Sequence, residues 1–325
     1  MRFMYNNQCA IFTPAMKKPT TIVDKSWVQR VCERPDISDR TFDLLKQKCQ
    51  PVVASVLMEE ILANHFQPNL NQATVSRMRR AVLDFHPHWM KHPAELVFEE
   101  LVKNEQILNA GLSQEQAMLA SEAMSDPAKL GNWMASRHEE KKKRRTARKQ
   151  QQAWFHKNAS AAFLHPPDLG TFAKNGSSFL AMVLKEPDLK LLVLDAYLGQ
   201  TWKRWHSAET AEIDIAFARL DCELVSKLPF THSYLLAEFL YDLGPITKIG
   251  APESKKSNPQ VLSGNQINNE EDQEYVASAL RCDRLLTCDD GMHQIAQAFR
   301  EAGYWKGKCI LIPGDEADQL ERHFA

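Results

Sequence analysis

The sequence predicts an α/β protein with a parallel sheet, and three observations support that prediction. Short apolar runs rich in β-branched residues, at 20–24 and 50–55, are each followed directly by a segment with helical spacing. The same alternation returns near the end of the chain, from about residue 269. The long middle of the chain has helical spacing and no convincing strand. Strands that alternate with helices favour a parallel sheet with helical crossovers, so we expect one α/β domain split by a long helical insertion.

The N-terminal part is expected to form the order strand, helix, helix, strand, helix. Residues 20–24 (TTIVD) predict a buried strand, and the helix after them ends before Pro35. A second helix follows over about 36–49. The apolar run 50–55 predicts a strand, and a helix follows over 56–66.

The C-terminal part is expected to resume this alternation. It predicts a helix over 269–281, a strand over 284–288, a helix over 290–303 and a last strand over 308–314. A further short strand is expected within 244–252.

The two ends of the chain are therefore expected to form one core. We assign residues 18–66 and 244–325 to a sheet flanked by helices, and residues 67–243 to an all-helical insertion.

Composition restricts the class of protein but does not indicate a partner. The 325 residues are 44% hydrophobic and 25% charged, typical of globular chains, and the net charge of -1 suggests no ligand class. No apolar run is long enough for a membrane helix, and the N-terminus is too polar for a secretory signal, so we expect a cytoplasmic protein with no membrane partner.

Cysteine and histidine usage gives little support for a soft-metal site. The seven cysteines are odd in number and form no Cys-x-x-Cys pair, so we expect reduced thiols rather than disulfides or a zinc site. The densest histidine cluster, residues 85–92 (FHPHWMKH), is interpreted as a surface turn in preference to a metal site.

Four carboxylates are expected at one edge of the sheet. Asp24 closes its strand, Asp289 follows another strand, Glu60 is just over one turn into a helix, and Asp272 is in the first turn of its helix. In an open parallel sheet the functional crevice lies beyond the carboxyl ends of the strands. Each of these positions places an acid near that edge.

Each acid also has a structural alternative. Asp24 caps the helix that follows it, and Asp289 or Asp290 caps the next one. Asp272 completes a variant capping box with Asn269, and Glu60 faces water beside Glu59.

Helical spacing favours a functional interpretation of these acids over a purely structural one. Asp272 shares an apolar stripe with Tyr275, Val276 and Ala279, and Glu60 leans toward the side of Leu57. Buried carboxylates are costly unless they are paired or bound to metal, and several converging acids repel each other. A divalent cation removes that conflict, and hard oxygen ligands favour Mg²⁺ or Mn²⁺. Such ions suit the attack of water on a phosphodiester.

Three segments resemble the PIN domain, a family of metal-dependent nucleases that are mostly endoribonucleases. They are TTIVDKSWVQRV, VVASVLMEEILA and DQEYVASALRCDRLLTCDDGM. The first resembles the opening strand with its Asp and a small polar residue two positions on, and the second the strand-to-helix segment with its Glu. The third resembles the helix that opens with Asp and the strand that ends Thr-x-Asp. The linker RCDR is short and the helical middle is far larger than a minimal core of that family.

The resemblance implies a PIN-like core and a cut of a phosphodiester backbone by water. It implies that Asp24, Glu60, Asp272 and Asp289 form the catalytic site and hold Mg²⁺ or Mn²⁺. Ser26 and Thr287 would hydrogen-bond those carboxylates or the bound water, although plain β-propensity is an alternative explanation for Thr287.

A basic run within the middle of the chain predicts a nucleic-acid contact. Its cations are Lys141, Lys142, Lys143, Arg144, Arg145, Arg148 and Lys149. Such a run is a phosphate-binding surface, and the aromatic pair at 154–155 suits stacking on unpaired bases. The alternatives are a solvated helix face and a docking site for an acidic partner that restrains the enzyme.

Two functional hypotheses follow. The first is a cytoplasmic, Mg/Mn-dependent endoribonuclease, for which RNA is the expected substrate, single-stranded DNA a possible one, and a toxin or defence effector one possible role. The second is a catalytically inactive PIN-like module that binds RNA or protein through its helical insertion. An inhibitory protein partner and a homo-oligomer are compatible with both. A phosphatase with an Asp nucleophile is disfavoured because the first strand does not end in Asp-x-Asp.

Overall fold

The structure is a computed structural model of the 325-residue chain. It describes residues 18–130, 228–249 and 269–324, apart from positions 68, 86, 104 and 318, together with the isolated positions 146, 181, 184 and 185. The helices, in chain order, are α1 (Lys25–Cys32), α2 (Ser38–Lys48), α3 (Ser55–His65), α4 (Gln72–Asp84), α5 (Pro93–Lys103), α6 (Gln114–Ser125), α13 (Pro229–Ile249), α14 (Asn269–Ala279), α15 (Asp290–Glu301) and α16 (Leu320–His323), with 3₁₀ helices η1 (Pro127–Leu130) and η4 (Gly314–Glu316). The strands are β1 (Thr20–Val23), β2 (Gln50–Ala54), β3 (His88–Met90), β4 (Arg284–Thr287) and β5 (Lys308–Leu311).

The strands of the described residues form one parallel sheet in the order β3-β2-β1-β4-β5. Ile22 in the central strand is in register with Val52 of β2 on one side and Leu285 of β4 on the other. All three side chains are fully buried, as expected for a parallel sheet covered on both faces. The predicted class, α/β with a parallel sheet flanked by helices, is confirmed.

The first and last parts of the chain meet in this sheet. β1 pairs with β4 across more than 260 residues of sequence. The Asp283 carboxylate accepts hydrogen bonds from the Thr20 backbone N–H at 2.8 Å and from its hydroxyl at 2.9 Å. The buried Trp27 indole donates to the Ala317 carbonyl at 3.1 Å. The bonds to Asp283 join the two parts of the chain at the amino edge of the sheet, and the Trp27 bond joins them beside η4.

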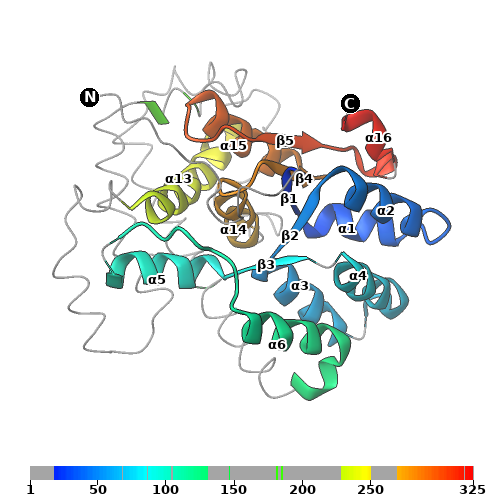
Figure 1. The fold of residues 1–325 in the computed structure, drawn as a ribbon. Helices are drawn as coiled ribbons and strands as arrows, with labels where there is room; N and C mark the ends of the chain where they lie inside the picture. The colour runs from blue at the N-terminus through cyan, green and yellow to red at the C-terminus, as the bar shows by residue number, and fades with distance from the viewer. Residues whose placement is uncertain are drawn as a thin grey trace.

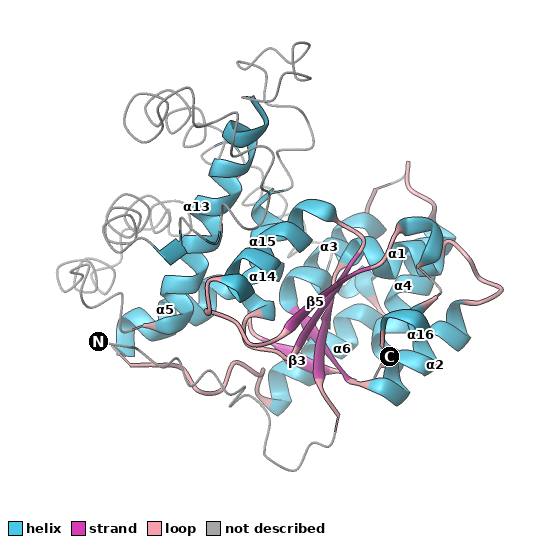
Figure 2. Ribbon diagram, turned by 90° about the horizontal axis from the view of Figure 1, so that it is seen from above, coloured by secondary structure: helices cyan, strands magenta, loops and turns pink. Residues whose placement is uncertain are grey.

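Helices cover the sheet on two sides. Figures 1 and 2 show α13, α14 and α15 on one side and α1, α2 and α4 on the other. This division follows from right-handed crossovers, because the chain moves in one direction from β1 through β2 to β3 and in the opposite direction from β4 to β5. Trp27 and Phe42 pack edge to face at 5.8 Å within the α1–α2 layer.

Two sequence-based expectations are wrong. The middle of the chain was expected to lack strands, but β3 lies at residues 88–90 and pairs with β2, so the sheet extends past the expected boundary at residue 67. Three residues are too few to display an alternating pattern. The strand expected within 244–252 is instead the end of α13, which continues to Ile249. The local β-propensity of that segment is a weak preference, and the continuing helix overrides it.

The other predicted helices and strands are confirmed within the described residues, usually to within a few positions. The five cysteines that the structure describes are free thiols, as expected. Among the described helices, none combines the length and the apolar character needed to cross a membrane.

A buried carboxylate joins two helices of the middle segment, α5 and α13. α13 lies against α5 and α14. The Glu100 carboxylate of α5 is fully buried and accepts hydrogen bonds from the backbone N–H groups of Phe230 and Thr231, at 3.2 and 2.8 Å, and from the Thr231 hydroxyl at 2.9 Å. Burial raises the pKa of Glu100, and these donors lower it in part.

Candidate functional site

The predicted acids surround the point where the strand order reverses. The chain leaves β1 toward β2 on one side, while β4 adds to β1 on the other. Crevices beyond the carboxyl ends of the strands at such a switch point are the usual ligand sites of open parallel sheets. Asp24 directly follows β1, and Thr287 ends β4. Because α14 leads into the amino end of β4, the beginning of α14, with Asp272, lies toward this same carboxyl edge.

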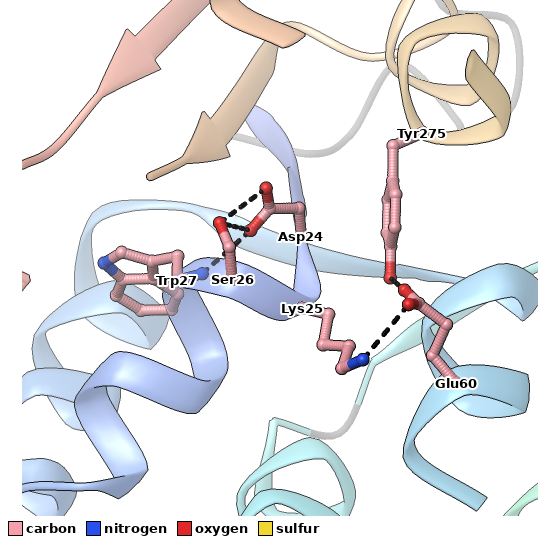
Figure 3. A network of polar contacts seen from close by, with 6 residues as sticks. All are labelled: Asp24, Lys25, Ser26, Trp27, Glu60 and Tyr275. Atoms are coloured by element: carbon pink, nitrogen blue, oxygen red, sulfur yellow. Dashed lines mark hydrogen bonds and ion pairs between the residues drawn. The ribbon is translucent and has the colours of Figure 1, made fainter. Parts of the chain in front are cut away.

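Asp24 is buried and held by three donors. It is 1% exposed and forms the N-cap of α1, where Oδ1 accepts from the Trp27 backbone N–H at 2.8 Å. The Ser26 hydroxyl lies 2.8 and 2.9 Å from the two carboxylate oxygens (Figure 3). The Thr287 hydroxyl donates to Oδ2. The pKa of Asp24 is raised to about 6, chiefly by burial and in smaller part by the charge of Asp289, while the Thr287, Trp27 and Ser26 donors lower it.

Asp289 is linked to Asp24 through Thr287. Its backbone N–H donates to the Thr287 hydroxyl oxygen at 2.9 Å, and that hydroxyl donates onward to Asp24. The Asp289 carboxylate caps α15 by accepting from the Met292 backbone N–H at 2.7 Å. The Ser26 hydroxyl also accepts from the Cys288 backbone N–H at 3.1 Å. The ends of β1 and β4 are thus joined by hydroxyl bridges beside two carboxylates.

Glu60 faces α14 and is paired with two side chains. The Tyr275 hydroxyl donates to Glu60 Oε2 at 2.8 Å, and the Lys25 ammonium lies 3.3 Å from Oε1. Figure 3 shows Tyr275 reaching from α14 to Glu60 on α3, with Lys25 approaching from the start of α1. The neighbouring Glu59 instead lines a cavity of about 470 Å³ together with Met58. Of the two adjacent glutamates, Glu60 is therefore the one turned toward the switch point.

The pKa of Asp272 depends on the charges of the other three predicted acids. Burial raises its pKa well above the usual range, and the charges of Asp289, Glu60 and Asp24, in that order, raise it further. The structure therefore brings Asp289, Glu60 and Asp24 each into electrostatic reach of Asp272, and Asp289 into reach of Asp24. Their mutual repulsion favours either protonation or a bound cation.

The donor chemistry of these residues fits a hard divalent cation, but their side chains do not form a closed ligand set. Within the described residues, no three His, Cys, Asp or Glu side chains lie close enough together to hold a metal ion as they stand. The Asp24 oxygens are engaged by hydroxyl groups, and Lys25 supplies a positive charge beside Glu60. Carboxylate oxygens are the ligands that Mg²⁺ and Mn²⁺ prefer. A bound cation of this kind would relieve the repulsion among the carboxylates.

The structure contains some of the helix caps that were considered as structural roles for the acids. Asp24 and Asp289 do cap helices, as those alternatives expected, and the charges of both also raise the pKa of Asp272. Asn269 is the first residue of α14, and the capping box expected with Asp272 depends on its side chain, which lies outside the described part of the chain. The predicted basic run, 141–149, lies outside the described residues, apart from the exposed helical position 146.

Three residues of the site were not assigned a function from the sequence. Lys25 follows Asp24 directly, and only the packing of α1 against α3 brings it to Glu60. Tyr275 was expected to share the buried stripe of its helix, but its bond to Glu60 depends on the position of α3. Tyr241 of α13 is close to the same acids, because the charges of Asp272, Asp289 and Asp24 add to burial in raising its pKa. It precedes the segment that was wrongly expected to form a strand, and no local pattern marked it.

No family model, curated protein or solved structure matches this chain.

Proposed function

We propose that this protein is a Mg²⁺- or Mn²⁺-dependent nuclease with a PIN-like core that hydrolyses phosphodiester bonds, in the first instance as an endoribonuclease. One observation supports it above the others: Asp24, Glu60 and Asp289 all raise the pKa of Asp272 at the switch point of a parallel sheet. A cluster of repelling acids at a ligand-binding edge is unfavourable for stability alone, and it suits a site that recruits a cation.

The four acids would act as the cation's ligands. Asp24 and Asp289 are fixed at helix N-termini, so their backbone positions vary little, while Glu60 and Asp272 approach from α3 and α14. The bound cation would polarise the phosphate and lower the pKa of the attacking water.

The neighbouring polar groups would position these carboxylates. The Ser26 and Thr287 hydroxyls orient Asp24, and the Tyr275 hydroxyl orients Glu60. Donors of this kind fix the direction of ligand lone pairs. Lys25 neutralises Glu60 in the cation-free protein, so we expect this ion pair to give way when the site is loaded.

A non-catalytic binding module is the second candidate. It is favoured by the pairing that already exists: Lys25 neutralises Glu60, and Asp24 and Asp289 cap helices, which gives three of the acids a structural role. On this alternative, RNA or protein binds elsewhere and needs no divalent cation.

Cleavage of single-stranded RNA and DNA in Mg²⁺ or Mn²⁺ separates the two candidates. We expect the wild-type protein to cut RNA, and Asp24→Asn and Asp272→Asn to lose at least about a hundred-fold in rate. Glu59→Gln and Asp290→Asn are matched controls, since each alters an acid next to a proposed ligand, and they should retain the wild-type rate. Binding of RNA that is indifferent to chelators, without cleavage, would support the non-catalytic module.

A further inference from the structure

The hydroxyl of Tyr241 is buried near the acid site and makes no hydrogen bond within the described part of the chain. Tyr241 is 5% exposed, and its hydroxyl oxygen is among the buried atoms that lack a partner there. Burial raises the pKa of Tyr241, and the charges of Asp272, Asp289 and Asp24 raise it further. The phenol therefore keeps its proton and is available as a hydrogen-bond donor.

The position of Tyr241 follows from the packing of α13 on α14. Figures 1 and 2 show these two helices side by side. The Gln273 side chain donates to the buried Glu238 carboxylate at 3.5 Å within this contact. Tyr241 is one turn further along α13, on the same face as Glu238, and Asp272 of α14 is the charge that acts on its phenol most strongly.

An unpaired buried donor beside several acceptors requires an explanation. Buried hydroxyl groups are nearly always hydrogen-bonded, and an exception is a place where a missing ligand is to be sought. The carboxylates near Tyr241 act on it as charges, yet none accepts its proton. A ligand that binds between the phenol and the carboxylates must accept a hydrogen bond from the phenol. It must also not be repelled by the negative charges of the carboxylates. A phosphate oxygen on a shared cation has both properties, because the cation screens it from the carboxylates.

We propose that Tyr241 donates its hydroxyl hydrogen to an oxygen of the phosphate that enters the acid site, and so contacts the nucleic-acid substrate directly. The inference rests on the proposed function, since it assigns a further residue to the same site. It adds a donor from α13, outside the segments that resemble the nuclease family. The helix that follows the long middle segment would thereby complete the site rather than merely cover it.

Tyr241→Phe tests the inference, because it removes only the hydroxyl. Tyr304→Phe is the matched control, since Tyr304 is also a buried tyrosine but donates to the Leu184 carbonyl at 3.2 Å. The probes are Mn²⁺ alone and inorganic phosphate in the presence of Mn²⁺, both measured by calorimetry on the full chain, together with kcat and KM for RNA cleavage. Melting temperatures give a readout of stability.

We expect Tyr241→Phe to melt at or above the wild-type temperature, because it breaks no hydrogen bond within the described structure. It should bind Mn²⁺ as the wild type does, but bind phosphate about ten-fold more weakly, and lose about ten-fold or more in kcat/KM. Tyr304→Phe should melt lower, because it loses a bond, and should keep phosphate binding and kcat/KM unchanged.

The possible failures are distinguishable. If Tyr241→Phe binds phosphate and cuts RNA like the wild type, the inference is wrong and the proposed function stands. A loss of Mn²⁺ affinity equal to the loss of phosphate affinity also overturns it, since Tyr241 would then support the cation. If phosphate binding depends on Tyr241 but no nucleic acid is cut, the contact between Tyr241 and phosphate stands, while the nuclease assignment and the contact with a nucleic-acid substrate fail. A wild-type protein that binds neither Mn²⁺ nor phosphate would contradict both the inference about Tyr241 and the proposed function.

Discussion

The Tyr275 hydroxyl lies 2.8 Å from Glu60 Oε2, and this bond joins α14 to α3 across 215 positions of sequence. The bond holds the Glu60 carboxylate of α3 against α14. The two helices belong to different segments that resemble the nuclease family. The Glu60 side chain is only 14% exposed, so water contributes little to its hydrogen bonding.

Tyr275→Phe should therefore destabilise the protein. A hydrogen bond to a charged group contributes about 1.5–3 kcal/mol, and the partly buried Glu60 would lose one of its two partners. Urea unfolding measures the change. A midpoint equal to that of the wild type would show that the bond contributes nothing to the α3–α14 contact.

Lys25→Met should tighten the binding of a divalent cation. The Lys25 ammonium lies 3.3 Å from Glu60 and competes with any cation for that carboxylate. The side chain is 26% exposed, so its effect is screened, and we expect an affinity for Mn²⁺ about five-fold higher, measured by calorimetry. Lys46→Met is the control, because Lys46 pairs with Asp43 at 2.7 Å on α2, away from the site. Affinity that stays the same or falls in Lys25→Met would mean that Lys25 is not a competitor.

The stability of the protein should fall as pH rises between about 4 and 6. The pKa of Asp24 is about 6 in the folded protein and 3.8 in its ordinary state, so the folded chain binds the proton more tightly. The stabilisation from this group is complete below the lower value and is lost as pH rises through the higher one. The difference corresponds to about 3 kcal/mol at most.

Asp24→Asn provides the check, because Asn also caps helices but does not ionise in this range. Urea unfolding at several pH values should show a smaller fall for this variant than for the wild type. Asp290→Asn, which alters an exposed acid, should follow the wild type. Parallel curves for Asp24→Asn and the wild type would show that Asp24 titrates normally in the folded protein.

Glu100→Ala should destabilise the contact between α5 and α13 strongly. The substitution leaves the backbone N–H groups of Phe230 and Thr231 without their acceptor in a buried position. We expect a loss of about 2–4 kcal/mol in the free energy of unfolding. Glu122→Ala, on the exposed face of α6, is the control and should change it little. Equal unfolding midpoints for the two variants would contradict the role assigned to Glu100.

The sheet and the position of the acids could largely be predicted from the sequence, because both depend on local patterns. β-branched runs marked β1 and β2, and the ends of those runs placed Asp24 and, one turn into the next helix, Glu60. β3 could not be predicted, since its three residues carry no periodicity and only pairing with β2 defines them.

The remaining features of the site depend on how distant helices pack. The pairing of Lys25 with Glu60 requires α1 and α3 to lie together, and the placement of Tyr241 requires α13 to pack on α14. The mutual repulsion at Asp272 is likewise a property of four segments at once. A single sequence offers no local signal for such distances.

Mn²⁺ titration of the wild-type protein and of Asp272→Asn, followed by calorimetry, tests most directly whether the four carboxylates share a cation. The wild type should bind Mn²⁺, Asp272→Asn should bind it at least about ten-fold more weakly, and Asp290→Asn should match the wild type. A wild-type protein that binds no Mn²⁺, or an Asp272→Asn variant that binds it equally well, would contradict the shared site.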